Sequence, residues 1–196
     1  HGMNLTKGLL GAIIKYPVSS LEIDKKSGDI RTKKMGYFYA DREVFQEIQE
    51  STGTFGKRHP LAFVLEAADD IAYRTGGIED AFKKGCITFE RLGQGLKDYC
   101  PEEQDGDYKD MVSLLERRRT RAIEKGITRP DANAVQNWTV QVQGKMIRSA
   151  TAGFVRHYEE LMEGTCKKEL LDGMPGTLMM RALGDIAYRY AFISDR

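Results

Sequence analysis

A helical hydrophobic period keeps one face of the chain apolar from residue 130 to residue 163, and this constrains the fold more than any other feature. The apolar positions recur at three- and four-residue steps, at Val135, Trp138, Val142, Met146, Ala150, Phe154, Tyr158 and Leu161. An α-helix turns once in about 3.6 residues, so this spacing places all of them on one side. A run this long predicts a spine helix, or two helices joined at Gly144 or Gly153.

Shorter stretches with the same period cover most of the remaining chain. They predict helices over residues 5–16, 41–50, 60–77, 78–84, 88–98, 107–125 and 178–196. Pro17, the Gly76-Gly77 pair and Gly126 are expected to end three of these helices. Residues 18–36 alternate instead around a Lys-Ser-Gly turn, which predicts a small β-hairpin. The expected fold class is therefore all-α, a helical bundle with one β-hairpin excursion.

Composition excludes several classes of protein. Apolar residues make up 41% of the chain and charged residues 30%, as in a globular domain. No apolar run approaches the roughly 20 residues of a membrane-spanning helix, so no membrane partner is expected. The cysteines Cys86, Cys100 and Cys166 are odd in number and widely spaced, which argues against a disulfide framework and favours the cytoplasm. A net charge of +1 gives no reason to expect nucleic acid as the main partner.

The helix that begins at Pro60 carries the most informative residues. Each residue turns an ideal helix by about 100°, and five apolar residues fall within about 60° of one direction, which predicts the core face. These residues are Leu61, Val64, Leu65, Ala68 and Ala72. Asp69 falls at the edge of that face, whereas Asp70 falls on the opposite side and is expected to be solvated or at an interface. A carboxylate at the edge of a core is costly unless it is paired or metal-bound. Asp69 is thus either a structural salt-bridge partner or a ligand to Mg²⁺ or Mn²⁺.

Residues 58–73, RHPLAFVLEAADDIAY, closely resemble a helix of bacterial deoxyguanosine triphosphate triphosphohydrolases (dGTPases) of the HD superfamily. In that family the helix supplies the last aspartate of an H…HD…D metal site. The strings MNLT (residues 3–6), IIKY (13–16), KKMGYF (33–38) and IEDAFKK (78–84) match in order and approximate spacing. The resemblance is strong over about residues 3–92 and weaker through the long helices that follow.

The resemblance implies roles for five residues. Asp69 would be the fourth ligand of a catalytic Mg²⁺ or Mn²⁺. Lys15 and Lys34 would contact the triphosphate, with Tyr16 beside Lys15 in the same motif. Tyr73 would pack against the deoxyribose and disfavour a 2′-hydroxyl. Taken alone, Lys15 is expected to be a solvated or dipole-favoured lysine at a helix end, and Lys33-Lys34 an ordinary surface pair.

Two departures from the family pattern affect these expectations. The family's other metal ligands, a His and a His-Asp pair, precede the region covered here, and His1, His59 and His157 do not fit them. We therefore expect an internal fragment truncated at both ends, a single helical unit. It would comprise the C-terminal part of an HD domain (about residues 1–100) and long helices (about 107–196). Gly77 stands where many family members have an aspartate that binds the sugar 3′-hydroxyl.

The expected function of the full-length protein is metal-dependent hydrolysis of dGTP or another dNTP to deoxynucleoside and inorganic triphosphate. The fragment alone is expected to be inactive. One alternative is an HD phosphohydrolase acting on another nucleotide, and another is a non-catalytic regulatory or nucleic-acid-binding module. Four arginines at residues 117–121 bear on the latter: most are expected to be solvated, the rest to contact an effector nucleotide, single-stranded DNA or another subunit. The long amphipathic helix offers an interface for a homo-oligomer.

Overall fold

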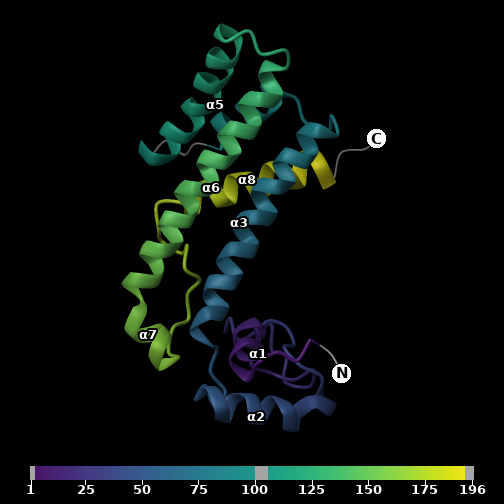
Figure 1. The fold of residues 1–196 in the computed structure, drawn as a ribbon, viewed down its shortest axis with the longest axis vertical. Helices are drawn as coiled ribbons and strands as arrows, with labels where there is room; N and C mark the ends of the chain where they lie inside the picture. The colour runs from purple at the N-terminus through teal and green to yellow at the C-terminus, as the bar shows by residue number, and fades with distance from the viewer. Residues whose placement is uncertain (1–2, 100–105, 193–196) are drawn as a thin grey trace. The chain divides into compact units, whose positions relative to one another are not determined.

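The computed structural model describes residues 3–99 and 106–192, and within them the fold consists of helices joined by loops (Figure 1). There is no β-strand among these residues, so the all-α fold class is confirmed. The α-helices are α1 (Lys7–Ile13), α2 (Arg42–Thr52), α3 (Pro60–Lys83), α4 (Phe89–Asp98), α5 (Gly106–Glu124), α6 (Pro130–Arg156), α7 (Tyr158–Glu163) and α8 (Thr177–Ala187). A 3₁₀ turn, Tyr39–Asp41, precedes α2, and a π-helical turn, Tyr188–Phe192, follows α8.

Capping side chains and glycines set several helix ends as local rules predict. The Thr6 hydroxyl accepts a hydrogen bond from the Leu9 amide at 3.2 Å, and Thr88 does the same for Arg91 at 3.2 Å. Gly126, with φ +66°, follows the end of α5, as the sequence predicts. The first helix is shorter than expected, since it ends at Ile13 rather than next to Pro17. Proline disfavours helical geometry in the residue before it, and here the chain is already extended at Ile14.

The Gly76-Gly77 pair does not end α3, and the predicted helices over 60–77 and 78–84 are one helix that continues to Lys83. Neither glycine adopts the positive φ of a helix C-terminus. Two interior glycines cost a helix roughly 1 kcal/mol each relative to alanine. Burial offsets that cost, because Thr75 is 1% exposed and Ile78 is fully buried on either side of the pair. Tertiary packing therefore overrides the local stop signal.

The predicted spine is two helices, but their junction lies at His157 rather than at Gly144 or Gly153. Gly153 has another role. A Cβ there would lie 1.9 Å from the Leu170 carbonyl oxygen, so only glycine allows these two backbones to approach. A glycine within a helical pattern can thus mark close packing as well as a break.

The predicted β-hairpin over residues 18–36 is wrong, because this segment is a loop with a single isolated bridge between Ser19 and Tyr37. Side chains organise it in place of a ladder. The Asp24 carboxylate accepts from the Lys26 amide at 2.9 Å, and Asp29 accepts from the Arg31 side chain at 2.6 Å. Aspartates that hydrogen-bond neighbouring backbone groups favour turns over strands. The isolated bridge brings Tyr37 into stacking contact with Phe45 of α2, with ring centroids 4.0 Å apart.

The chain divides into two compact units, and α3 and α6 each contribute residues to both. The first unit comprises residues 1–68 and 152–172; α1 packs on α2 within it (Figure 1). The second comprises residues 69–151 and 173–196, with α4, α5 and α8. The sequence-based assignment of an HD-domain portion to about residues 1–100 stays a prediction.

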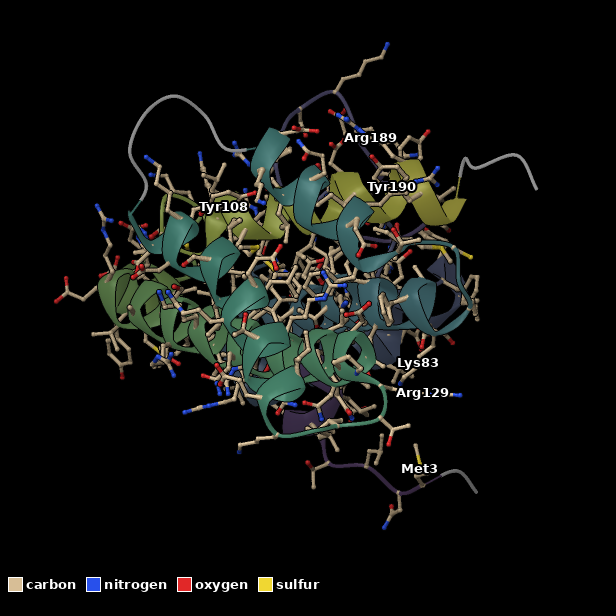
Figure 2. The ribbon with its side chains drawn as sticks, turned by 90° about the horizontal axis from the view of Figure 1, so that it is seen from above. Met3, Lys83, Tyr108, Arg129, Arg189 and Tyr190 are labelled. Carbon is tan, nitrogen blue, oxygen red and sulfur yellow. The ribbon has the colours of Figure 1, made fainter. Side chains whose placement is uncertain are left out.

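The core of the second unit is built around two buried aromatic side chains with satisfied polar atoms. Trp138 of α6 donates its indole N–H to the Met111 carbonyl of α5 at 2.7 Å, and α5 lies beside α6 in Figure 1. Tyr108 donates its hydroxyl to the Leu96 carbonyl at 2.7 Å. Gly95 allows α8 to approach α4, and Tyr190 of the following turn (Figure 2) lies nearby. Aromatic residues that bury their rings and satisfy their polar atoms contribute strongly to a core.

Candidate functional site

The face of α3 that packs into the core differs from the one the helical wheel selected. Leu61, Val64 and Leu65 are 53%, 42% and 38% exposed. The buried α3 residues lie nearly opposite and include Ala62, Phe63, Ala67 and Ile71. The helix carries apolar residues on both sides, and a helical wheel cannot show which of two apolar faces the rest of the chain will cover. The predicted core face is therefore the exposed one.

This correction reverses the predicted positions of the two aspartates. Asp69 is exposed and Asp70 is half-buried, so the prediction that Asp69 lies at the edge of the core is wrong. Tyr73 lies one helical turn beyond Asp69 and is 68% exposed. Residues four apart lie on the same side of a helix, so the carboxylate and the phenol ring share one accessible face. Asp69 as a metal ligand stays a prediction from the resemblance.

Lys15 lies against the first half of α3, within the first unit. Its ammonium is 2.8 Å from Glu66 Oε2, and the two side chains are 25% and 17% exposed. Lys15 is therefore paired and largely covered rather than fully solvated. A lysine held this way loses side-chain entropy on folding rather than on binding a ligand.

Arg58 lies behind this pair and is only 2% exposed. Its Nη1 atom lies 3.3 Å from Glu169 Oε1, and its Nη2 atom lies 3.9 Å from Glu66 Oε2. The guanidinium also lies over the Phe63 ring, 4.3 Å from the centroid. A buried charge needs such compensation, so these contacts account for an arginine in the core. In the sequence, Arg58 and Glu66 are identified only as part of the motif at residues 58–73, because the spacing of neither residue indicates an ion pair.

Tyr16 is buried, with 8% of its surface exposed. Burial raises the pKa of its hydroxyl, the Glu66 carboxylate adds to that rise, and the cations Arg58 and Lys15 oppose it. The ring therefore stays a neutral phenol at physiological pH, and can act as a hydrogen-bond donor.

Lys34 is exposed, in the loop that precedes Tyr37. Gly36 connects this loop to the Lys15-Tyr16 segment: its amide donates to the Val18 carbonyl at 3.0 Å, and a Cβ there would lie 1.7 Å from the Tyr16 carbonyl oxygen. The structure thus brings the two lysine-bearing motifs together through their backbones, although they are far apart in the sequence.

The described residues do not form a metal site. No group of three or more His, Cys, Asp or Glu side chains in residues 3–99 and 106–192 is arranged to hold an ion. His59 uses Nδ1 to accept from the Leu61 amide at 3.1 Å, and burial lowers its pKa. His157 faces Glu160 at 3.4 Å, and His1 lies outside the described residues. Asp69 is a single carboxylate, and a carboxylate oxygen is a ligand that Mg²⁺ and Mn²⁺ prefer.

A cavity of about 380 Å³ opens in the first unit, beside the start of α3. Its walls come from residues 52–54, 57–61, 154 and 161–164, and they include Lys57, His59 and Phe154. None of the five residues predicted to bind metal or substrate lines it. Lys57 already donates to the Glu163 carbonyl at 2.7 Å.

The arginine run at residues 117–121 is used in part for structure. Arg119 donates to Asp131 at 2.7 Å and to Glu90 at 3.1 Å, and its guanidinium lies over the Phe89 ring. Arg117 and Arg121 are exposed, whereas Arg118 and Arg119 are half-buried, so two of the four arginines rather than most of them are exposed. Figure 2 shows another basic residue, Arg129, reaching outward from the loop between α5 and α6.

Cys86 and Cys166 are both free thiols, and Cys100 lies outside the described residues. A membrane-spanning helix is not found in the described part of the chain, where no helix combines sufficient length and apolarity.

The curated proteins to which this chain is similar agree with the resemblance to dGTPases. No family model matches the chain. A deoxyguanosinetriphosphate triphosphohydrolase-like protein of Listeria monocytogenes is 33% identical over 193 residues, covering 98% of this chain and 40% of the relative. The deoxyguanosinetriphosphate triphosphohydrolase of Yersinia enterocolitica is 28% identical over 199 residues, 97% of this chain and 38% of the relative. A probable deoxyguanosinetriphosphate triphosphohydrolase of Pseudomonas aeruginosa is 28% identical over 204 residues, 97% and 41% of the two chains. The curated homologues of this chain are thus dGTPases and dGTPase-like proteins, and the chain spans about 40% of their length.

Proposed function

We propose that this chain is the substrate-binding portion of a longer enzyme that hydrolyses dGTP, or another dNTP, to a deoxynucleoside and inorganic triphosphate. The observation that carries the proposal is Lys15, whose ammonium is held 2.8 Å from Glu66 on α3. The same helix exposes Asp69 three residues later and Tyr73 one turn beyond that. The names of the relatives support this reaction class for the longer protein.

The residues of this chain would bind and orient the nucleotide. Lys15 and Lys34 would neutralise the triphosphate and stabilise the charge that the leaving triphosphate carries. The exposed ring of Tyr73 would pack against the deoxyribose, where a 2′-hydroxyl would be crowded. Positioning and charge stabilisation supply most of the catalysis in phosphoryl chemistry.

Asp69 would contribute one carboxylate ligand to a Mg²⁺ or Mn²⁺ ion. Such an ion, when bound, lowers the pKa of a water molecule and polarises a phosphoryl oxygen. The described residues supply one of the four ligands that the resemblance implies. We therefore expect this 196-residue chain alone to bind metal poorly and to be inactive.

The test is the release of inorganic triphosphate from dGTP in the presence of Mn²⁺. The longer protein is expected to release it, and Asp69→Ala in that protein should abolish the release. The 196-residue chain is expected to give none. Robust turnover by this chain alone, or turnover by the longer protein that survives Asp69→Ala, would contradict the proposal.

Gly77 favours a second candidate function within the same reaction class, the hydrolysis of another nucleotide. Glycine cannot make the side-chain contact to the sugar that an aspartate would make, and a Cβ at Gly77 would meet no atom within 4 Å. A panel of dNTPs, NTPs and guanosine tetraphosphate, tested on the longer protein, separates the two candidates. A preference for a nucleotide other than dNTPs would favour the second.

Single-stranded DNA, an effector nucleotide and a second copy of the chain remain proposals as partners. Their first test is binding of single-stranded DNA to the longer protein at increasing salt, because phosphate contacts give a steep salt dependence.

A further inference from the structure

Four ionisable side chains of the first unit, Lys15 among them, form one cluster of charges. Two are cations, Lys15 and Arg58, and two are carboxylates, Glu66 and Glu169. Each of the two cations lies close to at least one of the two carboxylates. A lysine intended for a triphosphate therefore has its charge already compensated inside the protein.

Glu66 is the centre of this cluster. Its Oε2 atom lies 2.8 Å from Lys15 Nζ and 3.9 Å from Arg58 Nη2, yet it is buried and lacks a hydrogen bond of good geometry. Proximity of charge, rather than directional bonding, compensates this oxygen. Such an attraction is less directional than a hydrogen bond, and Arg58 also lies close to the same carboxylate.

Glu169 differs from Glu66 in one useful respect. It contacts Arg58 through Nη1 at 3.3 Å and 3.4 Å, on the side of the guanidinium away from the Glu66 contact made by Nη2. Burial raises the pKa of Glu169, and Arg58 opposes that rise. The two carboxylates thus share Arg58, and Glu66 in addition contacts Lys15, which gives a matched pair for experiment.

We propose that Glu66 is an internal counter-ion of Lys15, and that it sets the affinity and charge selectivity of this lysine for phosphate ligands. The inference rests on the proposed function, in which Lys15 contacts the triphosphate. An incoming anion must compete with Glu66 for the ammonium and is repelled by the carboxylate it displaces. A triphosphate carries enough charge to compete, whereas inorganic phosphate, with fewer charges, competes poorly.

The test measures binding to the 196-residue chain by calorimetry at low salt, with inorganic triphosphate and inorganic phosphate as the two probes. Glu66→Gln keeps the shape of the side chain and removes its charge. We expect it to tighten triphosphate binding about tenfold and phosphate binding by a larger factor, so that selectivity for triphosphate falls. Glu169→Gln is the control and should change either affinity by less than about twofold.

A double-mutant cycle separates a counter-ion from a general change in local charge. In a Lys15→Met background, Glu66→Gln should change triphosphate affinity by less than about twofold, because the lysine it opposes is gone. Circular dichroism establishes that each variant folds. Should Glu66→Gln fail to fold, Glu66→Asp withdraws the carboxylate from Lys15 by one methylene and is expected to tighten binding about threefold.

The outcomes distinguish this inference from the function on which it rests. If Lys15→Met binds triphosphate as tightly as the unaltered chain, the role of Lys15 is wrong and both proposals fail. If Lys15→Met weakens binding but Glu66→Gln does not tighten it, only the counter-ion proposal is overturned. Equal tightening by Glu66→Gln with and without Lys15 would also overturn it.

Discussion

Replacing Gly36 with alanine tests how the two lysine-bearing motifs are joined. The new Cβ would lie 1.7 Å from the Tyr16 carbonyl oxygen and 2.8 Å from its carbonyl carbon. Both atoms belong to backbone, so no flexible side chain can move aside. The φ of Gly36 is not in the left-handed region, so the conflict comes from close approach and not from backbone conformation.

The size of the effect follows from the distance. Ordinary contact needs about 3.4 Å, so the two backbones must separate by about 1.7 Å. A shift of that size breaks the hydrogen bond from the Gly36 amide to the Val18 carbonyl, now 3.0 Å long. Overpacking costs about 1–3 kcal/mol and a lost hydrogen bond about 1 kcal/mol. We expect Gly36→Ala to lower the free energy of unfolding by about 2–4 kcal/mol.

The assay is urea denaturation of the 196-residue chain, followed by circular dichroism at 222 nm. Gly76→Ala is the matched control, because its Cβ would meet no atom within 4 Å and the site is inside α3. That variant is expected to raise the free energy of unfolding by about 0.5–1 kcal/mol. Trp138 is the only tryptophan and lies in the second unit, so its fluorescence shows whether the first unit unfolds separately.

A Gly36→Ala chain within about 0.5 kcal/mol of the unaltered one would refute the close approach of these two segments. A shift of the Tyr16 carbonyl should also move its neighbour, Lys15. Weaker binding of inorganic triphosphate by Gly36→Ala is therefore a second expected consequence, provided the variant remains folded.

Three further predictions follow from single contacts. Trp138→Phe removes the donor to the Met111 carbonyl and part of a buried ring. It should lower the free energy of unfolding, measured in urea, by about 1–3 kcal/mol. An unchanged free energy of unfolding would contradict the buried contact. Burial lowers the pKa of His59 below 6.5 in the folded chain. As pH falls from 6.5 through the folded-state pKa, the unfolded chain therefore binds more protons than the folded chain, and the free energy of unfolding decreases. His59→Asn keeps an acceptor for the Leu61 amide without titrating, and the difference in melting temperature between the two chains should change across this window; a constant difference would refute it. Gly77→Asp places a carboxylate in open space on α3. In the longer protein this substitution should lower KM for dGTP about tenfold, and it should leave KM for the 3′-deoxy analogue of dGTP unchanged. Equal effects on both KM values would exclude a 3′-hydroxyl contact.

The sequence by itself was sufficient for the helical class and for those ends that local chemistry decides. α4 starts after Thr88 and α5 is followed by Gly126, both close to the predicted positions. A capping hydroxyl satisfies a free amide, and a glycine adopts a left-handed backbone, whatever the rest of the chain does. The family of the relatives also followed from sequence, because several motifs match in order and spacing.

The tertiary structure decided what depends on partners distant in the chain. Gly76-Gly77 remains helical because its neighbours are buried, and the exposed position of Asp69 follows from which apolar face of α3 the chain covers. The charge cluster of Lys15, Arg58, Glu66 and Glu169 is not revealed by any spacing in the sequence, since Arg58 and Glu169 are 111 positions apart. Local propensities amount to about 1 kcal/mol per residue, whereas burial of side chains contributes more and depends on elements distant in sequence. For this reason the helices could be predicted, whereas their buried faces and the counter-ion of Lys15 could not.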